Sequence, residues 1–273
     1  MSDGNPQVFR YLKKAAKRII PLGLALYFIP IPTAIFFAFG LVDVTRNQPL
    51  SLFLFDKYFF GNGVLTWLIS PFNLLIDVIS LPFRNKGIYG IDDFPEKYAS
   101  EINFIIETLK SKPEVLTQMA EYAKTEDRAM IFFKWYGKKL PSPIEIPEFE
   151  NEFDYIRTIG ISAFNAHRST GLHFGPFRST IRVLYNLNRI ESDDVFIEVG
   201  DHRQKWRDNQ LFIFDDTLLH RSVNESDELR YCLFADVLRP SHVPGVLRIV
   251  VAVTQFVFLR VNYMFYKNWT FIR

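Results

Sequence analysis

The chain has a single cysteine, Cys232, among its 273 residues. An intrachain disulfide framework is therefore excluded, and a reducing compartment is mildly favoured. A charge excess is also lacking, since 32 Lys and Arg residues are balanced by 30 Asp and Glu residues. The formal net charge of +2 excludes the strongly basic surface that is typical of nucleic-acid-binding proteins. No internal repeat or low-complexity tract is present.

Charge is absent from a long stretch near the N-terminus. Residues 19–42 are 24 consecutive residues without a charged side chain, and roughly 20 apolar residues cross a bilayer core as a helix. The sequence therefore predicts a transmembrane helix over 19–42, kinked by its prolines. A buried helix of a soluble domain and a cleaved signal peptide are the alternatives, and the length of the run argues against both.

A second apolar run, residues 63–83, is interrupted by Pro71 and Asp77. It predicts either a second span or a helix that lies in the membrane interface. Basic residues flank the two runs: Arg10, Lys13, Lys14, Lys17 and Arg18 before the first, Arg84 and Lys86 after the second. The positive-inside rule then places the rest of the chain, from residue 89 on, on the cytoplasmic side. We expect residues 1–88 to anchor the protein in a lipid bilayer, in a bacterial inner membrane.

Phenylalanine is unusually frequent, with 28 residues, and it recurs in the C-terminal segment 241–273. This segment is apolar but is interrupted by Arg248 and Arg260, with Tyr263, Tyr266 and Trp269 near its end. It predicts either an interfacial helix or a helix that packs on the catalytic domain.

From residue 89 to residue 240 the composition is that of a soluble domain. Apolar residues recur with helical spacing in 95–111 and 113–125, which predicts two helices packed against a sheet. Five short strand patterns follow: RTIGISAFN, TIRVLYNLN, DVFIEVG, LFIFDD and RYCLFADVL. The expected fold is a mainly β catalytic domain, a double-stranded β-helix or jelly roll with flanking helices, preceded by a transmembrane helix or hairpin.

Two histidines are each followed by an arginine at similar spacing. Arg182 comes nine residues after His173, and Arg230 comes ten residues after His220. Neutral imidazoles bind divalent transition metals, and guanidinium groups bind carboxylates in a bidentate manner. Iron(II), two histidines and a small dicarboxylate together suggest a 2-oxoglutarate-dependent oxygenase. The alternative is that both histidines are structural or exposed.

The remaining polar residues of interest are less specific. His167, His202 and His242 lack comparable arginine partners, which indicates turns or surface positions. Asp215 and Asp216 precede His220 and would ligate the metal, shape the turn or orient the ligands.

At these residues the sequence resembles the aspartyl/asparaginyl β-hydroxylase family of iron- and 2-oxoglutarate-dependent oxygenases. The resemblance runs over 162–240 and rests on HFGPFRSTIR, FDDTLLH and RYCLFADVLRP. It implies O2 as oxidant and five binding residues: His173 and His220 for Fe(II), and Arg230, Arg182 and Ser162 for 2-oxoglutarate.

A wider resemblance, over roughly 70–240, links the chain to membrane-bound lipid A and ornithine-lipid hydroxylases of the same superfamily. It rests on NKG and DDFPE within 85–96, FFKWYG at 132–137 and WRDNQLFIFDDTLLH at 206–220. It implies that the substrate is an acyl chain of a membrane lipid.

Two positions depart from these patterns. Gly175 stands where the lipid A hydroxylases have an aspartate, and Leu184 stands where the protein hydroxylases have a histidine. An aspartyl or asparaginyl side chain of a protein is therefore the alternative substrate. A halogenase with chloride beside Gly175, and a membrane-tethered binding module without catalysis, are two further interpretations. The sequence does not indicate the oligomeric state.

Overall fold

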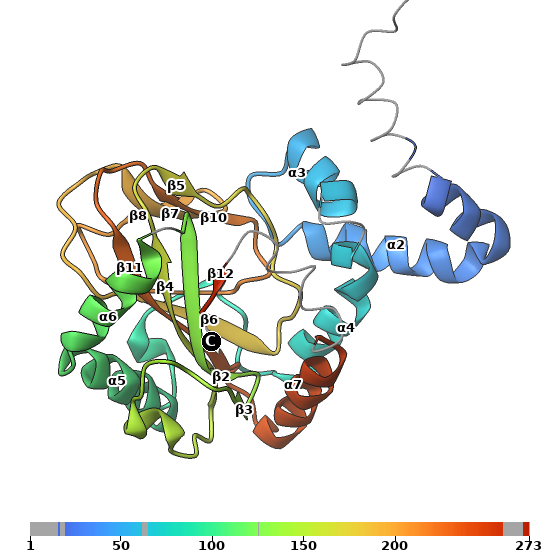
Figure 1. Ribbon diagram of the computed structural model, residues 1–273. Coiled ribbons are helices and arrows are strands. Elements are labelled where there is room, and N and C mark those ends of the chain that lie inside the picture. Colours follow the sequence, from blue (N-terminus) through green and yellow to red (C-terminus); the bar gives the residue numbers. More distant parts are fainter. Residues whose placement is uncertain (1–15, 17–19, 62–64, 125, 259–269, 273) are drawn as a thin grey trace, which may run out of the picture.

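The computed structural model describes residues 16, 20–61, 65–124, 126–258 and 270–272. The five basic residues before the first apolar run, and residues 259–269 with Tyr263, Tyr266 and Trp269, lie outside these ranges. The described chain combines a β-sandwich with two groups of helices (Figure 1).

The strands of the sandwich form two sheets. The larger has the order β1 (Ile88–Tyr89), β9 (Leu211–Phe214), β6 (Thr180–Asn186), β11 (Arg230–Leu238), β4 (Ile156–Phe164), β2 (Arg128–Trp135), β12 (Thr270–Phe271), with β3 (Lys138–Lys139) paired to β2. The smaller has the order β5 (Arg168–Ser169), β10 (His220–Asn224), β7 (Val195–Val199), β8 (His202–Lys205). From β4 to β11 the chain passes repeatedly between the sheets, which is the jelly-roll topology that the sequence predicts.

The five predicted strands correspond to β4, β6, β7, β9 and β11. The strands β8 and β10 were not predicted, because their sequences HRQK and HRSVN lack apolar alternation. They are strands because they pair with β7 on its two sides, and this pairing outweighs local propensity.

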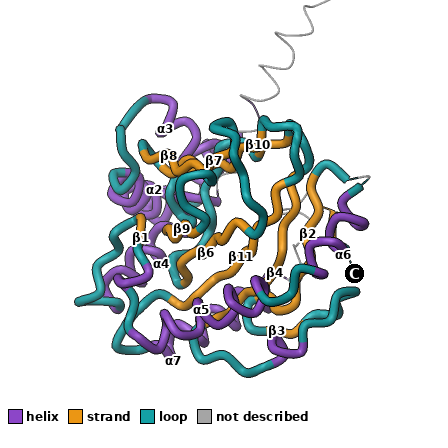
Figure 2. The backbone as a smooth tube through the Cα atoms, turned by 90° about the vertical axis from the view of Figure 1, so that its left-hand side faces the viewer, coloured by secondary structure: helices purple, strands orange, loops and turns teal. Residues whose placement is uncertain are grey.

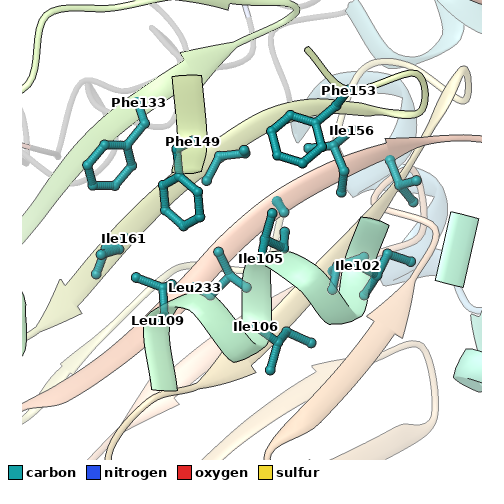
Figure 3. Packing of buried hydrophobic residues seen from close by; sticks show 14 of the residues in the cluster. Ile102, Ile105, Ile106, Leu109, Phe133, Phe149, Phe153, Ile156, Ile161 and Leu233 are labelled. Atoms are coloured by element: carbon teal, nitrogen blue, oxygen red, sulfur yellow. The ribbon is translucent and has the colours of Figure 1, made fainter. Parts of the chain in front are cut away.

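The two predicted soluble helices are α5 (Glu96–Lys110) and α6 (Glu114–Ala123), and they pack against the outer face of the larger sheet. The buried side chains of α5 recur every three or four residues, so they form one apolar face. Figure 3 shows this face against the sheet, with labelled residues Ile102, Ile105, Ile106, Leu109, Phe133, Phe149, Phe153, Ile156, Ile161 and Leu233. This core supports the sheet from behind.

A second helical group lies on another side of the sandwich, as Figures 1 and 2 show. It comprises α2 (Pro30–Val44), α3 (Leu52–Asp56), the π-helix η1 (Lys57–Gly61), α4 (Leu65–Ile79) and α7 (Pro244–Phe258). Two short 3-10 helices, η2 (Ile91–Asp93) and η3 (Pro147–Glu150), connect other elements. The second apolar run of the sequence thus forms α4, and the C-terminal segment begins with α7.

The predicted span over 19–42 is divided into two helical pieces. Residues 20–28 are helical, Ile29 is a bend, and α2 begins at Pro30. Pro30 and Pro32 lack the backbone N–H that a continuous helix needs. Within the described ranges no single helix is long and apolar enough to cross a membrane, although Leu52–Gly61 and Thr66–Ile79 together reach that length and composition across a 97° bend.

The outer faces of three helices expose large apolar side chains at intervals of three or four residues. These are Ile31, Ile35, Phe39 and Val42 on α2, Leu68, Phe72, Leu75 and Val78 on α4, and Val246, Ile249, Val253 and Phe256 on α7. Exposed apolar surface of this extent is characteristic of interaction sites.

Candidate active site

The two predicted metal-binding histidines lie directly opposite each other. His173, in the connection from β5 to β6, forms an isolated antiparallel bridge with His220, the first residue of β10. The backbone N–H of His173 donates to the carbonyl of His220 at 3.0 Å, and the reverse bond measures 2.9 Å. The centroids of the two imidazole rings are 4.2 Å apart. The structure therefore brings together the pair that the sequence predicts.

Hydrogen bonds determine which ring nitrogen of each histidine is available. Nδ1 of His173 lies 2.7 Å from the carbonyl of Gly171, and Nδ1 of His220 lies 2.8 Å from the carbonyl of Leu218. Because a carbonyl oxygen only accepts, each neutral ring has its proton on Nδ1 and its lone pair on Nε2. Burial lowers the pKa of His220 well below its ordinary value, and His173 lowers it further. This pair of nitrogen donors fits a divalent transition metal such as iron.

The position beside the histidines at Gly175 is filled by a carboxylate from another segment. A Cβ added at Gly175 would lie 1.8 Å from Oδ2 of Asp216 and 2.4 Å from its carboxyl carbon. Asp216 therefore occupies the space in which a side chain two residues after His173 would begin. Its Oδ1 lies 3.2 Å from Nε2 of His220. The same carboxylate takes up the volume that the halogenase interpretation needs for chloride.

Arg182 orients Asp216. Its Nη1 lies 3.0 Å from Oδ1 of Asp216, and its Nε donates to Oδ1 of Asp236 on the neighbouring strand at 2.7 Å. Its guanidinium carbon lies 3.9 Å from the ring centroid of Phe234. Within the described ranges no three His, Cys, Asp or Glu side chains form a metal-binding group. The donor set is therefore a histidine pair with Asp216 beside it.

Arg230 is buried between the two sheets, with 1% of its surface exposed. Its guanidinium lies 4.8 Å from the ring centroid of Phe164 and 5.0 Å from that of Trp206, and its Nη1 donates to Oγ of Ser222. Its Nε is a buried donor without a hydrogen-bond partner among the described residues. A buried cation with an unpaired donor is costly unless an anion neutralises it, so this pocket fits a carboxylate.

The distance along β10 suits a short dicarboxylate. His220 and Ser222 are two residues apart, so they project from the same face of the strand at about 7 Å spacing. Ser222 binds Arg230, and a five-carbon dicarboxylate has a comparable length. Ser162 is buried on β4 opposite Cys232, and its hydroxyl donates to the carbonyl of Cys232 at 3.3 Å.

Arg178 connects the helices α2 and α4 to the segment that carries Asp216. This residue is 1% exposed, and its guanidinium binds Asp43 of α2 at 2.5 Å and Asp77 of α4 at 2.6 Å. It also donates to Oγ1 of Thr217 at 3.3 Å, next to Asp216. Three further bonds extend this buried charge network, from Arg46 to Asp215, from Asn85 to Asp215 and from Arg239 to Asp77.

The charges within the network are mutually neutralising. Burial alone would raise the pKa of Asp215, but Arg46 and Arg178 outweigh it and hold the pKa below its usual range. Sequence analysis missed this network and the placement of Asp216. The sequence gives one indication of the network: Asp43 follows the first apolar run, and Asp77 lies inside the second.

The other three histidines are at the surface, as the sequence indicates. His167 has a positive φ of 55° in a turn and pairs with Asp227. His202 on β8 and His242 before α7 are exposed. His202 stacks on Phe212, and the ring of His242 lies against Phe83 at an angle of 52°. None of them contributes to the pocket around His173.

The fold and the site together define a jelly-roll protein with a pair of facing histidines at the start of β10. Residues 106–240 match the family model of the aspartyl/asparaginyl beta-hydroxylases. Over these residues the match confirms the resemblance seen in the sequence.

Among individual proteins, the ornithine lipid ester-linked acyl 2-hydroxylase of Rhizobium tropici is 29% identical over 91 residues. The alignment covers 33% of this chain and 32% of that relative. The chain thus spans about a third of the curated relative that it matches.

Two solved structures are also similar in part. A 2OG-Fe(II) oxygenase family oxidoreductase from Burkholderia pseudomallei has 12% identity and a TM-score of 0.31, covering 47% of this chain and 80% of that one. A salicylate 1,2-dioxygenase from Pseudaminobacter salicylatoxidans has 10% identity and a TM-score of 0.29, covering 50% and 34%. Both TM-scores are below 0.5, so neither structure bears on the function.

Proposed function

We propose that this protein is an Fe(II)- and 2-oxoglutarate-dependent hydroxylase that acts on an acyl chain of a membrane lipid. The observation that carries the lipid assignment is the position of the site beside apolar helices. Phe174, next to His173, packs into a cluster with Val44, Tyr58 and Trp67 from the helical group. The outer faces of α2 and α4 expose apolar side chains. An acyl chain would therefore leave the bilayer close to the histidine pair.

The residues have distinct roles in this proposal. His173 and His220 hold the metal through Nε2, and Asp216, oriented by Arg182, stands beside them. Arg230 and Ser222, with Ser162 nearby, hold the distal carboxylate of 2-oxoglutarate in a pocket without bulk water. Bound iron and 2-oxoglutarate supply the oxidising chemistry with O2. The protein positions the acyl carbon and excludes water from the reaction.

We also propose that the helical group associates with a bilayer, with the sandwich on the cytoplasmic side. The exposed apolar faces of α2, α4 and α7 support this location. The charge distribution around the two apolar runs supports the orientation.

The decisive experiment is lipid mass spectrometry on cells that express the wild type or His173→Ala. We expect lipid species with one additional oxygen on an acyl chain in the wild type, and their loss in His173→Ala. The surface variant His202→Ala should behave as the wild type. If no oxygenated lipid depends on the wild-type protein, the lipid assignment is wrong.

A protein substrate is the second candidate, because the matching family model is that of aspartyl and asparaginyl hydroxylases. In that case oxidation would map to aspartyl or asparaginyl residues of peptides and not to lipids. Peptide mapping of the same cells distinguishes the two substrates without a further variant.

Replacing Arg230 with methionine should weaken 2-oxoglutarate binding at least about 30-fold, since removing one partner of a buried charge pair costs 2 kcal/mol or more. The protein without cosubstrate should be no less stable, because methionine removes a buried cation whose Nε is unpaired. Binding is measured by calorimetry with Mn(II) in place of iron. Arg221→Met, on the opposite face of β10, is the control. Equal affinities of Arg230→Met and the control would exclude Arg230 as the carboxylate site.

A further inference from the structure

A groove with one cationic wall lies between α7 and the turn that joins β2 to β3. Its volume is about 750 Å³, which is in the range of small-molecule sites. Three basic side chains line it: Lys138 from β3, Arg157 from β4 and Arg248 from α7. No acidic residue is part of its lining. The lining of the groove is therefore basic, and Asp154 beside Arg248 balances part of its charge.

Arg157 is the deepest of these cations. Its Nη2 donates to the carbonyl of Phe153, while its Nε is buried and has no hydrogen-bond partner within the described ranges. Burial lowers the pKa of Arg157, and the nearby positive charge of Arg248 lowers it further. The nearest acidic neighbour of Arg248 is Asp154 at 3.6 Å, and both of these side chains are largely exposed. An anion in the groove would relieve the repulsion and satisfy the buried donor.

The other wall of the groove is apolar and continues onto an exposed surface. Ile249 lines the groove and is also part of the exposed apolar face of α7, with Val246, Val253 and Phe256. A cationic pocket at the edge of an apolar helix face matches a molecule with an anionic head and a hydrocarbon tail.

The groove is also at the end of the larger sheet that carries Arg182 and Asp236. Arg157 directly precedes Thr158, whose cross-strand partner is Asp236. Asp236 binds Arg182, which holds Asp216 in the active site. A molecule in the groove would therefore bind at the end of the sheet that carries Arg182 and Asp236.

We propose that this groove binds the phosphate headgroup of an anionic membrane phospholipid, with the acyl chains along α7. The interaction holds the active-site end of the sandwich against the bilayer. It requires neither iron nor turnover, so it stands or falls independently of the hydroxylase proposal.

The test is native mass spectrometry of the full-length protein in a neutral detergent, titrated with phosphatidylglycerol or phosphatidylcholine. We expect tighter retention of phosphatidylglycerol by the wild type. Lys138→Gln/Arg248→Gln should reduce this affinity by about tenfold, since each substitution removes a charged hydrogen-bond donor. Both residues are on the surface, so the variant should keep the wild-type melting temperature.

The matched control is Arg189→Gln/Lys205→Gln, which also removes two positive charges. Arg189 lies beyond the C-terminal end of β6, and Lys205 is on β8 of the smaller sheet. It should retain phosphatidylglycerol as the wild type does. Equal retention of the two lipids, or an equal loss in both double variants, would overturn the proposal. Competition by glycerol phosphate at the same concentration as the lipid would also overturn it, because the groove would then bind free anions.

Discussion

Replacing Arg178 with methionine should lower the free energy of unfolding by about 3–5 kcal/mol, the usual cost of removing one partner from a buried ion pair. The substitution leaves Asp43 and Asp77 without their shared cation and removes the bond to Thr217. Urea denaturation of the protein in detergent, followed by tryptophan fluorescence, measures the effect. The buried Trp67 and Trp206 report on the helical group and the sandwich, respectively.

The matched control is Arg189→Met, because Arg189 is an exposed arginine that pairs only at the surface with Glu191. It should change the free energy of unfolding by less than about 0.5 kcal/mol. Adding Asp43→Asn to Arg178→Met should recover part of the loss, since one uncompensated charge disappears. A loss below 1 kcal/mol in Arg178→Met would show that the network does not hold the helices to the site.

The second large effect is expected from Gly175→Asp. The new Cβ would meet Asp216 at 1.8 Å, so Asp216 must move away from His220 and Arg182. We expect metal affinity and hydroxylation to fall about 10–100-fold, the range seen when a group that supports metal ligands is lost. Binding of Mn(II) and product formation measure the two quantities.

The double variant Gly175→Asp/Asp216→Gly then tests whether any carboxylate in this space is sufficient, or whether the carboxylate has to come from residue 216. It returns one carboxylate to the same volume from the opposite segment, and we expect partial recovery of metal affinity. Gly171→Ala, in the same connection but with nothing within 4 Å of its added Cβ, is the control. Full activity of Gly175→Asp alone would show that Asp216 has no supporting role.

The sandwich was predictable because its principal strands are short segments that alternate or run apolar, separated by polar turns. The same periodicity identified α5 and α6. The polar strands β8 and β10 were not predictable, because their conformation depends on pairing with β7 and not on their own composition. The strand β10 matters most, since it begins with His220.

The site was predictable only in part. The spacing of His173, Arg182, His220 and Arg230, together with the resemblance, predicted a site, and the structure pairs two of these residues, His173 and His220. The contacts of Asp216 with Gly175, and of Arg178 with Asp43 and Asp77, join segments that are 41, 135 and 101 residues apart. No local pattern encodes such contacts, because they depend on how the sheets and helices pack.

The first apolar run, residues 19–42, shows another limit of prediction from the sequence. The run is helical and apolar, but the prolines Pro30 and Pro32 separate the helix over 20–28 from α2. The result is a set of short helices with exposed apolar faces in place of one continuous helix.

The buried charge network has a consequence for how such proteins diversify. Asp43 and Asp77 neutralise arginines of the sandwich, so the helical region and the sandwich have to change together. A relative could exchange these apolar helices for an unrelated segment only by also replacing Arg178 and Arg239. The two regions are therefore expected to be inherited as one unit, and a shift to a new membrane or substrate should proceed through the exposed faces of the helices.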